Sequence, residues 1–257
     1  MKRKLDFLLR TQNVDAVFED DTLIVLCKPA HLLVLPDRYD QTLPNLQTLL
    51  RGELGTIFTV HRIDKETSGL VLFAKTVEAH ASLNQQFENR SVSKLYKAIV
   101  QGEPSEEHGE IDLPLSERNH RMRVDEKNGK ESLTEFSVLE RFHGYALIEA
   151  RPRTGRMHQI RVHLKEIGLP ILADPLYGDG EPFFLSAVKP NYKVEEEERP
   201  LLSRTALHAS SLRILHPISG QKMSFEAEIP KDMRTVLKYL RKFRSEDSGS
   251  QMREGRK

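Results

Sequence analysis

The chain has 257 residues, of which 38% are hydrophobic and 30% charged, and its formal net charge is +1 at neutral pH. This composition is typical of a globular protein and excludes a wholly disordered one. The single cysteine excludes an intramolecular disulfide and a cysteine metal cluster. No apolar run is long enough for a signal peptide or a membrane span, so we expect a cytoplasmic protein without a membrane partner. The length allows one large domain or two closely joined halves.

In the first part of the chain, short apolar runs alternate with helical patterns. Residues 15–36 predict a hairpin-like β unit, with one strand at Leu23–Cys27 and a second apolar run that ends at Pro36. Thr76 is a suitable N-cap for a helix that ends near Asn89. The other elements expected here are a helix at 43–54 and strands at 57–60 and 69–74.

The second part predicts more strands, a loop and two helices. Residues 178–200 indicate a loop-like insertion, and the residues from 245 on lack apolar anchors and are expected to be disordered. We therefore expect an extension at 1–16, a folded domain at 17–244 and a tail at 245–257. The expected strands are 94–100, 132–139, 145–150, 206–215 and 222–229, and the helices are 158–167 and a final one that carries Val236, Leu237, Leu240 and Phe243.

Basic residues are clustered although the net charge is small. Segment 118–130 has five Lys or Arg residues against two acids, and the chain from Lys231 on has nine against four. Segment 151–163, RPRTGRMHQIRVH, surrounds the start of a predicted helix, where guanidinium groups can form an anion site. The alternative is a solvated polar face, on which we expect Arg161 to lie beside His158 and Lys165.

A second polar cluster, HRID at 61–64, directly precedes the apolar run 69–74. An Asp before a Thr-Ser pair most often caps a turn. A carboxylate that a nearby guanidinium keeps ionised can instead act as a nucleophile or a base. The spacing of the residues leaves both interpretations of Asp64 open. A metal site is not expected, because His158 and His163 would lie on different faces of a helix without a carboxylate at ligand spacing.

Four longer segments resemble, in family order, the signatures of the RluA family of RNA pseudouridine synthases. They are HRIDKETSGLVLFAK (61–75), KLYKAIVQG (94–102), RTGRMHQIRVHLKEIGLPILADPLYG (153–178) and LHASSLRILHPISG (207–220). The resemblance implies an α+β fold with a mixed, largely antiparallel sheet, flanking helices and a central catalytic cleft. It also implies isomerisation of uridine to pseudouridine within RNA, without a cofactor or a metal.

By this resemblance Asp64 matches the catalytic aspartate, Tyr96 the active-site tyrosine and Arg161 the arginine that pairs with the aspartate. The partner is structured RNA, with ribosomal RNA expected first and transfer RNA as the alternative. The target uridine must be flipped out of the stack, and Arg62 is the candidate that fills the gap. The candidate RNA-binding residues are His61, Arg62, Arg153, Arg156 and His158.

Several alternatives remain at this point. Many relatives carry an S4 RNA-binding module, and the residues before Val17 are too few for one, so the basic segments of the catalytic domain would have to grip the RNA. We expect a monomer. One rival is a catalytically inactive RNA-binding relative, and another is a glycosidase or nucleoside hydrolase, for which Glu66 is the only near carboxylate. The sequence does not decide whether Asp64 attacks C1′ of the sugar or C6 of the base.

Overall fold

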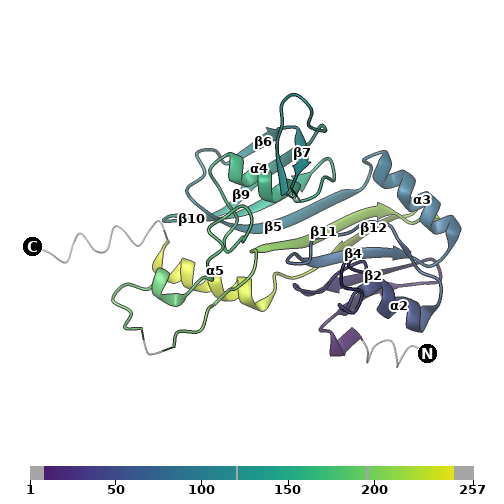
Figure 1. The fold of residues 1–257 in the computed structure, drawn as a ribbon, viewed down its shortest axis with the longest axis horizontal. Coiled ribbons are helices and arrows are strands. Elements are labelled where there is room, and N and C mark those ends of the chain that lie inside the picture. The colour runs from purple at the N-terminus through teal and green to yellow at the C-terminus, as the bar shows by residue number, and fades with distance from the viewer. Residues whose placement is uncertain (1–8, 120, 195–196, 246–257) are drawn as a thin grey trace, which may run out of the picture. The chain divides into compact units, whose positions relative to one another are not determined.

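The computed structural model describes residues 9–119, 121–194 and 197–245, and it divides into two compact units (Figure 1). The first unit comprises Met1–Leu95 and His208–Glu228, and the second comprises Tyr96–Leu207 and Ile229–Lys257. Of the expected extension and tail, residues 1–8 and 246–257 lie outside the described part of the chain. The expected domain at 17–244 includes residues of both units, and its boundaries stay a prediction.

The first unit is built on an antiparallel sheet with one parallel pair. The strand order is β1-β2-β4-β11, β12 pairs with β11 and β3 pairs with β4. Only the β4–β11 pairing is parallel. The elements are β1 (Asp15–Glu19), β2 (Leu23–Lys28), α2 (Leu46–Leu54), β3 (Phe58–Thr59), β4 (Ser68–Ala74), α3 (Val77–Glu88), β11 (Leu207–Leu215) and β12 (Lys222–Glu226).

The helix starts in this unit follow from their capping residues. Thr76 accepts a hydrogen bond from the Ala79 amide, as the sequence predicts, and α3 then buries Ala79 and Leu83. Asn45 caps α2 in the same way, so this helix begins at Leu46 and not at 43. Every residue of β4 is buried, which explains why the run 69–74 contains no polar side chain.

The expected hairpin lies at a different place from the one that the sequence indicated. β1 and β2 form it, in antiparallel register with Asp15 opposite Cys27. The apolar run that ends at Pro36 is not a strand; it contributes only an isolated bridge between Leu33 and Asn45. The run was misassigned because Leu32 and Val34 are buried through loop packing, and periodicity alone does not distinguish this from a strand.

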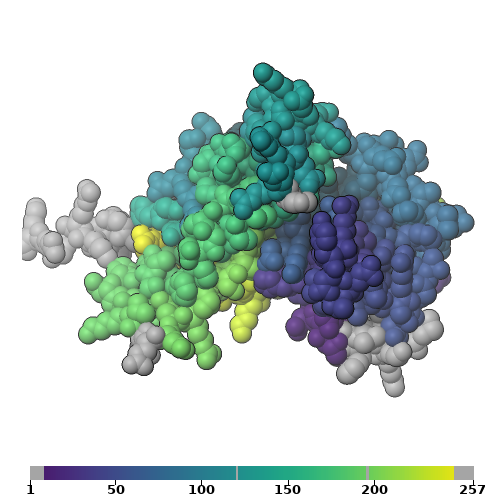
Figure 2. Space-filling view, viewed as in Figure 1, coloured from purple at the N-terminus to yellow at the C-terminus, as the bar shows by residue number. Residues whose placement is uncertain are grey.

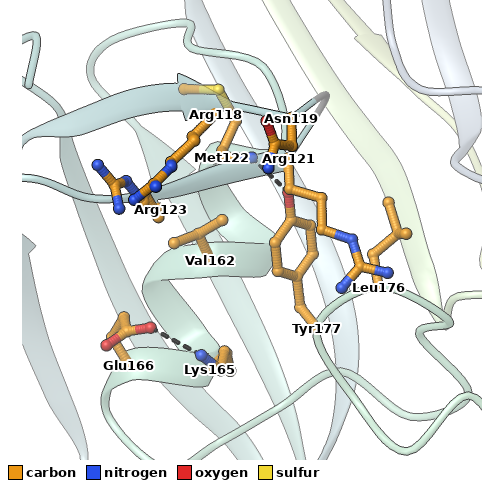
Figure 3. A pocket seen from close by; sticks show the side chains of 10 residues that line it. All are labelled: Arg118, Asn119, Arg121, Met122, Arg123, Val162, Lys165, Glu166, Leu176 and Tyr177. Carbon is orange, nitrogen blue, oxygen red and sulfur yellow. Dashed lines mark hydrogen bonds and ion pairs between the residues drawn. The ribbon is translucent and has the colours of Figure 1, made fainter.

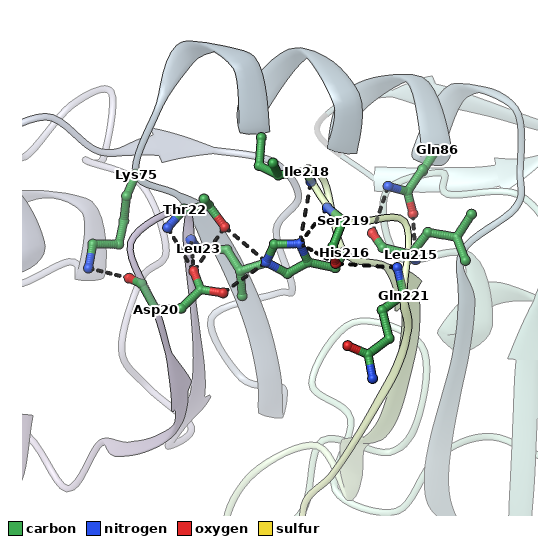
Figure 4. A network of polar contacts seen from close by, with 10 residues as sticks. All are labelled: Asp20, Thr22, Leu23, Lys75, Gln86, Leu215, His216, Ile218, Ser219 and Gln221. Carbon is green, nitrogen blue, oxygen red and sulfur yellow. Dashed lines mark hydrogen bonds and ion pairs between the residues drawn. The ribbon is translucent and has the colours of Figure 1, made fainter.

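A polar network ties the β1–β2 turn to the turn between β11 and β12 (Figure 4). Asp20 Oδ2 lies 2.9 Å from His216 Nε2, and its Oδ1 accepts hydrogen bonds from the amides of Thr22 and Leu23. His216 Nδ1 accepts a hydrogen bond from the Ser219 amide at 3.1 Å. His216 therefore closes its own turn and holds the neighbouring one, which accounts for the LHPISG segment in structural terms.

The second unit contains an antiparallel sheet in the order β5-β10-β9-β6 and a separate β7–β8 hairpin. The sequence did not predict β6, β7 or β8, because each is only four or five residues long and mostly polar. The elements are β5 (Ser93–Gln101), β6 (His108–Asp112), β7 (Leu115–Arg118), β8 (Arg121–Val124), β9 (Leu133–Phe142), β10 (Tyr145–Pro152), α4 (Gln159–Glu166), the 3₁₀ turn Leu185–Ala187 and α5 (Lys231–Phe243).

The core of this unit is formed by β5 and β10 together with the apolar faces of α4 and α5. Ile99, Ile148, Leu164 and Leu237 are among its fully or almost fully buried members. The mixed, largely antiparallel sheet and the few flanking helices confirm the expected α+β class. None of the helices in the described residues combines the length and the apolar character that crossing a membrane requires.

Candidate active site

Asp64 lies in the loop that leads from β3 into β4, within the first unit. Its backbone carbonyl accepts a hydrogen bond from the Thr67 amide at 3.1 Å, which closes a turn. Ile63 and Thr67 are buried on either side, whereas Asp64 is half-buried and Arg62 is exposed. The loop is thus fixed by its apolar and backbone contacts, and the side chains of Arg62 and Asp64 are presented from a rigid turn.

A buried lysine fixes the same loop from behind. Lys28 has no exposed side-chain surface, and its ammonium donates to the carbonyls of Pro29 (2.8 Å), Leu32 (2.7 Å) and Lys65 (3.2 Å). The His31 amide donates to the same Lys65 carbonyl at 2.8 Å. Since Lys65 follows Asp64 directly, these contacts determine the backbone position of the carboxylate.

His61, a candidate RNA-binding residue, is held by contacts with β4 and α3 of the first unit. Its Nε2 accepts a hydrogen bond from the Leu72 amide at 3.0 Å, and its ring stacks on Phe87. Burial lowers the pKa of His61 to about 3, and the neighbouring charge of Lys94 adds to this effect. His61 is therefore neutral near pH 7, and any contact with RNA would not be an ion pair.

The Ser68-Gly69 pair that follows the loop joins β4 to β11. Ser68 Oγ lies 2.9 Å from His208 Nδ1, and the partner residue of Gly69 in the parallel pairing is Ala209. A Cβ atom at Gly69 would lie 2.2 Å from the Ala209 carbonyl oxygen, and the φ angle of Gly69 is +112°. Only glycine allows this approach, so the TSG sequence after Asp64 has a structural origin.

Tyr96 lies on β5, opposite Ala150 of β10. Its side chain is half-buried and packs against the core of the second unit. Arg161 lies in the first turns of α4, which belongs to the same unit. The structure thus positions Tyr96 and Arg161 in one unit and Asp64 in the other, and the expected Asp64–Arg161 pairing stays a prediction.

Arg161 does not lie on a solvated polar stripe, which corrects the sequence-based expectation. Its side chain is only 3% exposed, and Nε and Nη2 donate to the two carboxylate oxygens of Asp174, both at 2.7 Å. The guanidinium also lies over the ring of Tyr177, 5.1 Å from its centre. The stripe was expected because the sequence does not reveal that the loop after α4 returns a fully buried carboxylate to this helix.

Asp174 is itself fixed by backbone donors. Its Oδ1 accepts hydrogen bonds from the amides of Leu176 (2.9 Å) and Tyr177 (3.1 Å). The planar bidentate contact leaves the guanidinium of Arg161 with a single orientation. Asp174, Tyr177 and Lys28 were all missed as supporting residues. The segment ADPLYG contained the signal, since an Asp within a buried apolar run needs a partner.

Three other polar residues of 151–163, Thr154, Gln159 and His163, belong to a buried network. Thr154 and the Arg156 amide donate to Gln159 Oε1, and Gln159 Nε2 donates to Thr134 Oγ1 at 2.9 Å. His163 Nε2 lies 3.0 Å from the Leu113 carbonyl, so it carries the proton, and Nδ1 accepts from Thr134. Burial lowers the pKa of His163, as this neutral tautomer requires. These residues hold the start of α4 on β9.

The other candidate RNA-binding residues surround this helix start. Arg153 forms an ion pair with Glu135, and Arg156 donates to the Glu131 carbonyl at 3.1 Å. His158 has a φ angle of 52°, and its Nδ1 lies 2.9 Å from the Tyr177 hydroxyl. In the described part of the chain, no three His, Cys, Asp or Glu residues are grouped so that they could hold a metal ion.

The chain is similar to known proteins in both its sequence and its fold. The profile of the family described as RNA pseudouridylate synthase matches residues 22–166. A protein of Zymomonas mobilis named ribosomal large subunit pseudouridine synthase D is 40% identical over 240 residues, which are 88% of this chain and 73% of that protein. Its namesake in Neisseria meningitidis serogroup B is 39% identical over 93% of this chain, which spans 64% of that protein.

A further relative and one solved structure are also similar to this chain. An uncharacterised RNA pseudouridine synthase of Bacillus subtilis, YlyB, is 37% identical over 93% of this chain and 76% of its own length. The structure of human RNA pseudouridylate synthase domain containing 4 superimposes with a TM-score of 0.70, covers 94% of this chain and 98% of the human one, and has 24% identity. The last likeness concerns the fold alone.

Proposed function

Because the chain belongs to the RNA pseudouridylate synthase family and is an RNA pseudouridine synthase, an isomerase, we propose that it modifies ribosomal RNA with Asp64 as the nucleophile. The sequence motifs had indicated this family and enzyme class, and the comparisons confirm both. The ribosomal target rests on one observation: the relatives that are 39% and 40% identical carry the name ribosomal large subunit pseudouridine synthase D.

The reaction breaks the bond between N1 of uracil and C1′ of the ribose and forms a bond between C5 and C1′. The proton on C5 leaves and N1 gains one, so the atoms balance without an oxidant, a reductant or hydrolysis. We propose that the Asp64 carboxylate attacks the nucleotide, either at C1′ or at C6, and is released when the new bond has formed. The rigid turn around Asp64 supports this role, since a fixed nucleophile needs no reorganisation.

In this proposal Arg161 keeps Asp64 ionised once the RNA excludes water, because a neighbouring positive charge favours the carboxylate. The bidentate contact with Asp174 supports the role indirectly: it orients the guanidinium and offsets the cost of burying it. Tyr96 would stack on the flipped uracil, and its hydroxyl would accept the C5 proton. Arg62, exposed on the same loop as Asp64, would fill the space that the flipped base leaves.

We further propose that the chain acts as a cytoplasmic monomer without a cofactor. Transfer RNA is the competing substrate. Pseudouridines would be mapped in total RNA from cells with and without the gene for this chain, and the purified chain would be supplied with deproteinised large-subunit ribosomal RNA or with transfer RNA. The proposal expects a site in ribosomal RNA that is lost from the cells without the gene and restored in vitro. Loss confined to transfer RNA would overturn the ribosomal assignment.

A further inference from the structure

The β7–β8 hairpin carries three arginines on one face of a two-stranded ribbon. Arg118 is directly opposite Arg121 in the antiparallel register, and Arg123 is opposite Ser116. Opposite residues of such a pair share a face, so all three arginines belong to the same side. All three are exposed. Like charges directly opposite each other destabilise a hairpin, so the Arg118–Arg121 pair has an electrostatic cost that a bound anion would relieve.

The hairpin is held firmly on α4 by its other face. Leu115 and Met122, both buried, pack with Val162 and Tyr177 in a small apolar cluster. The Met122 amide donates to the Tyr177 hydroxyl at 2.9 Å, and this hydroxyl also lies 2.9 Å from His158 Nδ1. A short hairpin is marginally stable alone. Because this one is anchored, its arginines project from a fixed frame.

A pocket of about 320 Å³ lies between the hairpin and α4 (Figure 3). Its lining combines the three arginines and Lys165 with one carboxylate, Glu166, which pairs with Lys165 at 3.0 Å. Figure 3 shows Arg123 above Val162 at one side of the pocket and Arg121 extending beside Tyr177 toward Leu176 at the other. In the space-filling view, side chains of this teal part of the chain lie on the visible surface (Figure 2). The site is open, apolar at its base and positively charged at its rim.

Three other arginines of the second unit have carboxylate partners. Arg153 pairs with Glu135, Arg141 with Glu107 and Arg241 with Glu140. Within residues 9–119, 121–194 and 197–245, neither Arg118 nor Arg121 has such a partner, and Arg123 has only Asp125 at 3.9 Å. Two cations that no neighbouring carboxylate neutralises can give their full charge to an external anion.

We propose that Arg118 and Arg121, with Arg123 from the same hairpin, bind backbone phosphates of the RNA substrate. This inference rests on the RNA activity of the proposed function. RNA is a polyanion that must bind the enzyme in every turnover, and its phosphates can neutralise arginines that have no carboxylate partner in the described residues. The contact is to phosphates, because the arginines lie at an open rim and guanidinium forks match phosphate oxygens. It supplies affinity and register, not selection of the base.

The test is the salt dependence of RNA binding for the variant Arg118→Gln/Arg121→Gln. Dissociation constants would be measured over a range of salt concentrations with deproteinised large-subunit ribosomal RNA and, separately, with transfer RNA. We expect weaker binding and a slope of log K against log salt that is smaller by about 1.4 to 1.8, because two contacts each contribute roughly 0.7 to 0.9.

Two controls separate a local contact from a general effect of charge. Arg241→Gln/Lys242→Gln removes an equal number of positive charges, two, from α5. Its slope of log K against log salt should equal that of the parent chain. Arg118→Lys/Arg121→Lys keeps both hairpin charges and should also keep the parental slope. The proposal is overturned if the Gln variant of the hairpin binds with the parental slope, or if the α5 variant loses as much. The binding measurement does not require turnover. A failed search for a pseudouridine in ribosomal RNA would therefore refute the proposed ribosomal target, and the measured role of the hairpin arginines in RNA binding would still hold.

Discussion

The Asp64 loop and the segment 151–163 are both rich in polar residues, but they use them in opposite ways. In the loop, buried apolar residues and backbone carbonyls hold the chain, with Lys28 as the main donor, while Arg62 is exposed and Asp64 half-buried. In the segment 151–163, Thr154, Gln159 and His163 are buried in a closed network that fixes α4.

This difference shows that a polar cluster in a sequence is not by itself a functional cluster. Within the second segment Arg161, for which we propose a catalytic role, is buried against Asp174, thirteen residues further on. The first region has the candidate groups Arg62 and Asp64 on a loop, and the second buries most of its polar groups as scaffold. Each of the following predictions tests one side of this contrast.

The largest effect on stability is expected where the scaffold holds a buried charge. Asp174→Asn removes the negative partner of Arg161 and leaves a buried cation without compensation, which should lower the free energy of unfolding by about 3 to 5 kcal/mol. Activity should be lost as well, because the guanidinium is no longer oriented. Denaturant unfolding and single-turnover assays measure the two effects.

The matched control is the exposed ion pair of the same segment. Arg153→Gln breaks the contact with Glu135, in which the arginine side chain is 47% exposed, and should change stability by no more than about 1 kcal/mol. Equal losses in the two variants would contradict the division into a buried scaffold and an exposed surface.

Tyr96 tests whether a half-buried residue of β5 faces the substrate. If its ring stacks on the flipped uracil, Tyr96→Ala should weaken RNA binding by roughly 1 to 3 kcal/mol. Tyr96→Phe keeps the ring and should therefore bind normally, but it should turn over very slowly because the proton acceptor is missing. Normal turnover by the phenylalanine variant would limit Tyr96 to stacking, and parental behaviour of both variants would place it in the core.

The closed network predicts a moderate effect for Thr134→Val. This change keeps the shape of the side chain but leaves Gln159 Nε2 and His163 Nδ1 without the hydroxyl that joins them. A buried polar group left unsatisfied costs about 1 to 3 kcal/mol, so we expect a loss of stability in that range. RNA affinity should be unchanged. A variant as stable as the parent would show that the network does not hold α4.

The last prediction concerns the stability of the folded protein at acid pH. His61 is neutral when folded, with a pKa of about 3, whereas an unfolded histidine has a pKa of about 6.5. Between these two values the unfolded chain binds a proton that the folded one does not, so stability is full above pH 6.5 and falls as the pH decreases toward 3. The slope due to one such histidine is at most about 1.4 kcal/mol per pH unit.

In the variant His61→Gln, the free energy of unfolding should therefore fall less steeply as the pH decreases from 6.5 toward 3. We call this part of the pH profile the acid limb. His108 on β6 is exposed and serves as the control, since His108→Gln should leave the limb unchanged. Unfolding by urea at a series of pH values measures both. A limb that is equally steep in the His61 variant and the parent would contradict the neutral, buried histidine.

Much of the fold was predictable because local signals were strong. The buried strand β4 and the Thr76 cap follow from an apolar run and a capping residue, which depend only on neighbouring positions. The β7–β8 hairpin was missed because its strands contain four residues each and bury side chains only against α4 and Tyr177. Such tertiary packing leaves no period in the sequence.

The candidate site was predictable only in its motif residues. Asp64, Tyr96 and Arg161 came from the family resemblance, whereas Lys28 and Asp174, which hold the two regions, were not recognised. Both act through contacts with residues that are far along the chain or through backbone carbonyls. The pairs Lys28–Lys65 and Arg161–Asp174 exist only after folding, so spacing in one sequence does not reveal them.

The most direct test of the central claim, that Asp64 is the nucleophile, is pseudouridine formation by the variant Asp64→Asn. This change keeps the size of the side chain and removes its charge, while the turn around it is held by backbone contacts that do not involve the carboxylate. We predict a folded protein that binds large-subunit ribosomal RNA as the parent does and forms no pseudouridine in a single-turnover assay. More than a trace of the parental rate would contradict the claim.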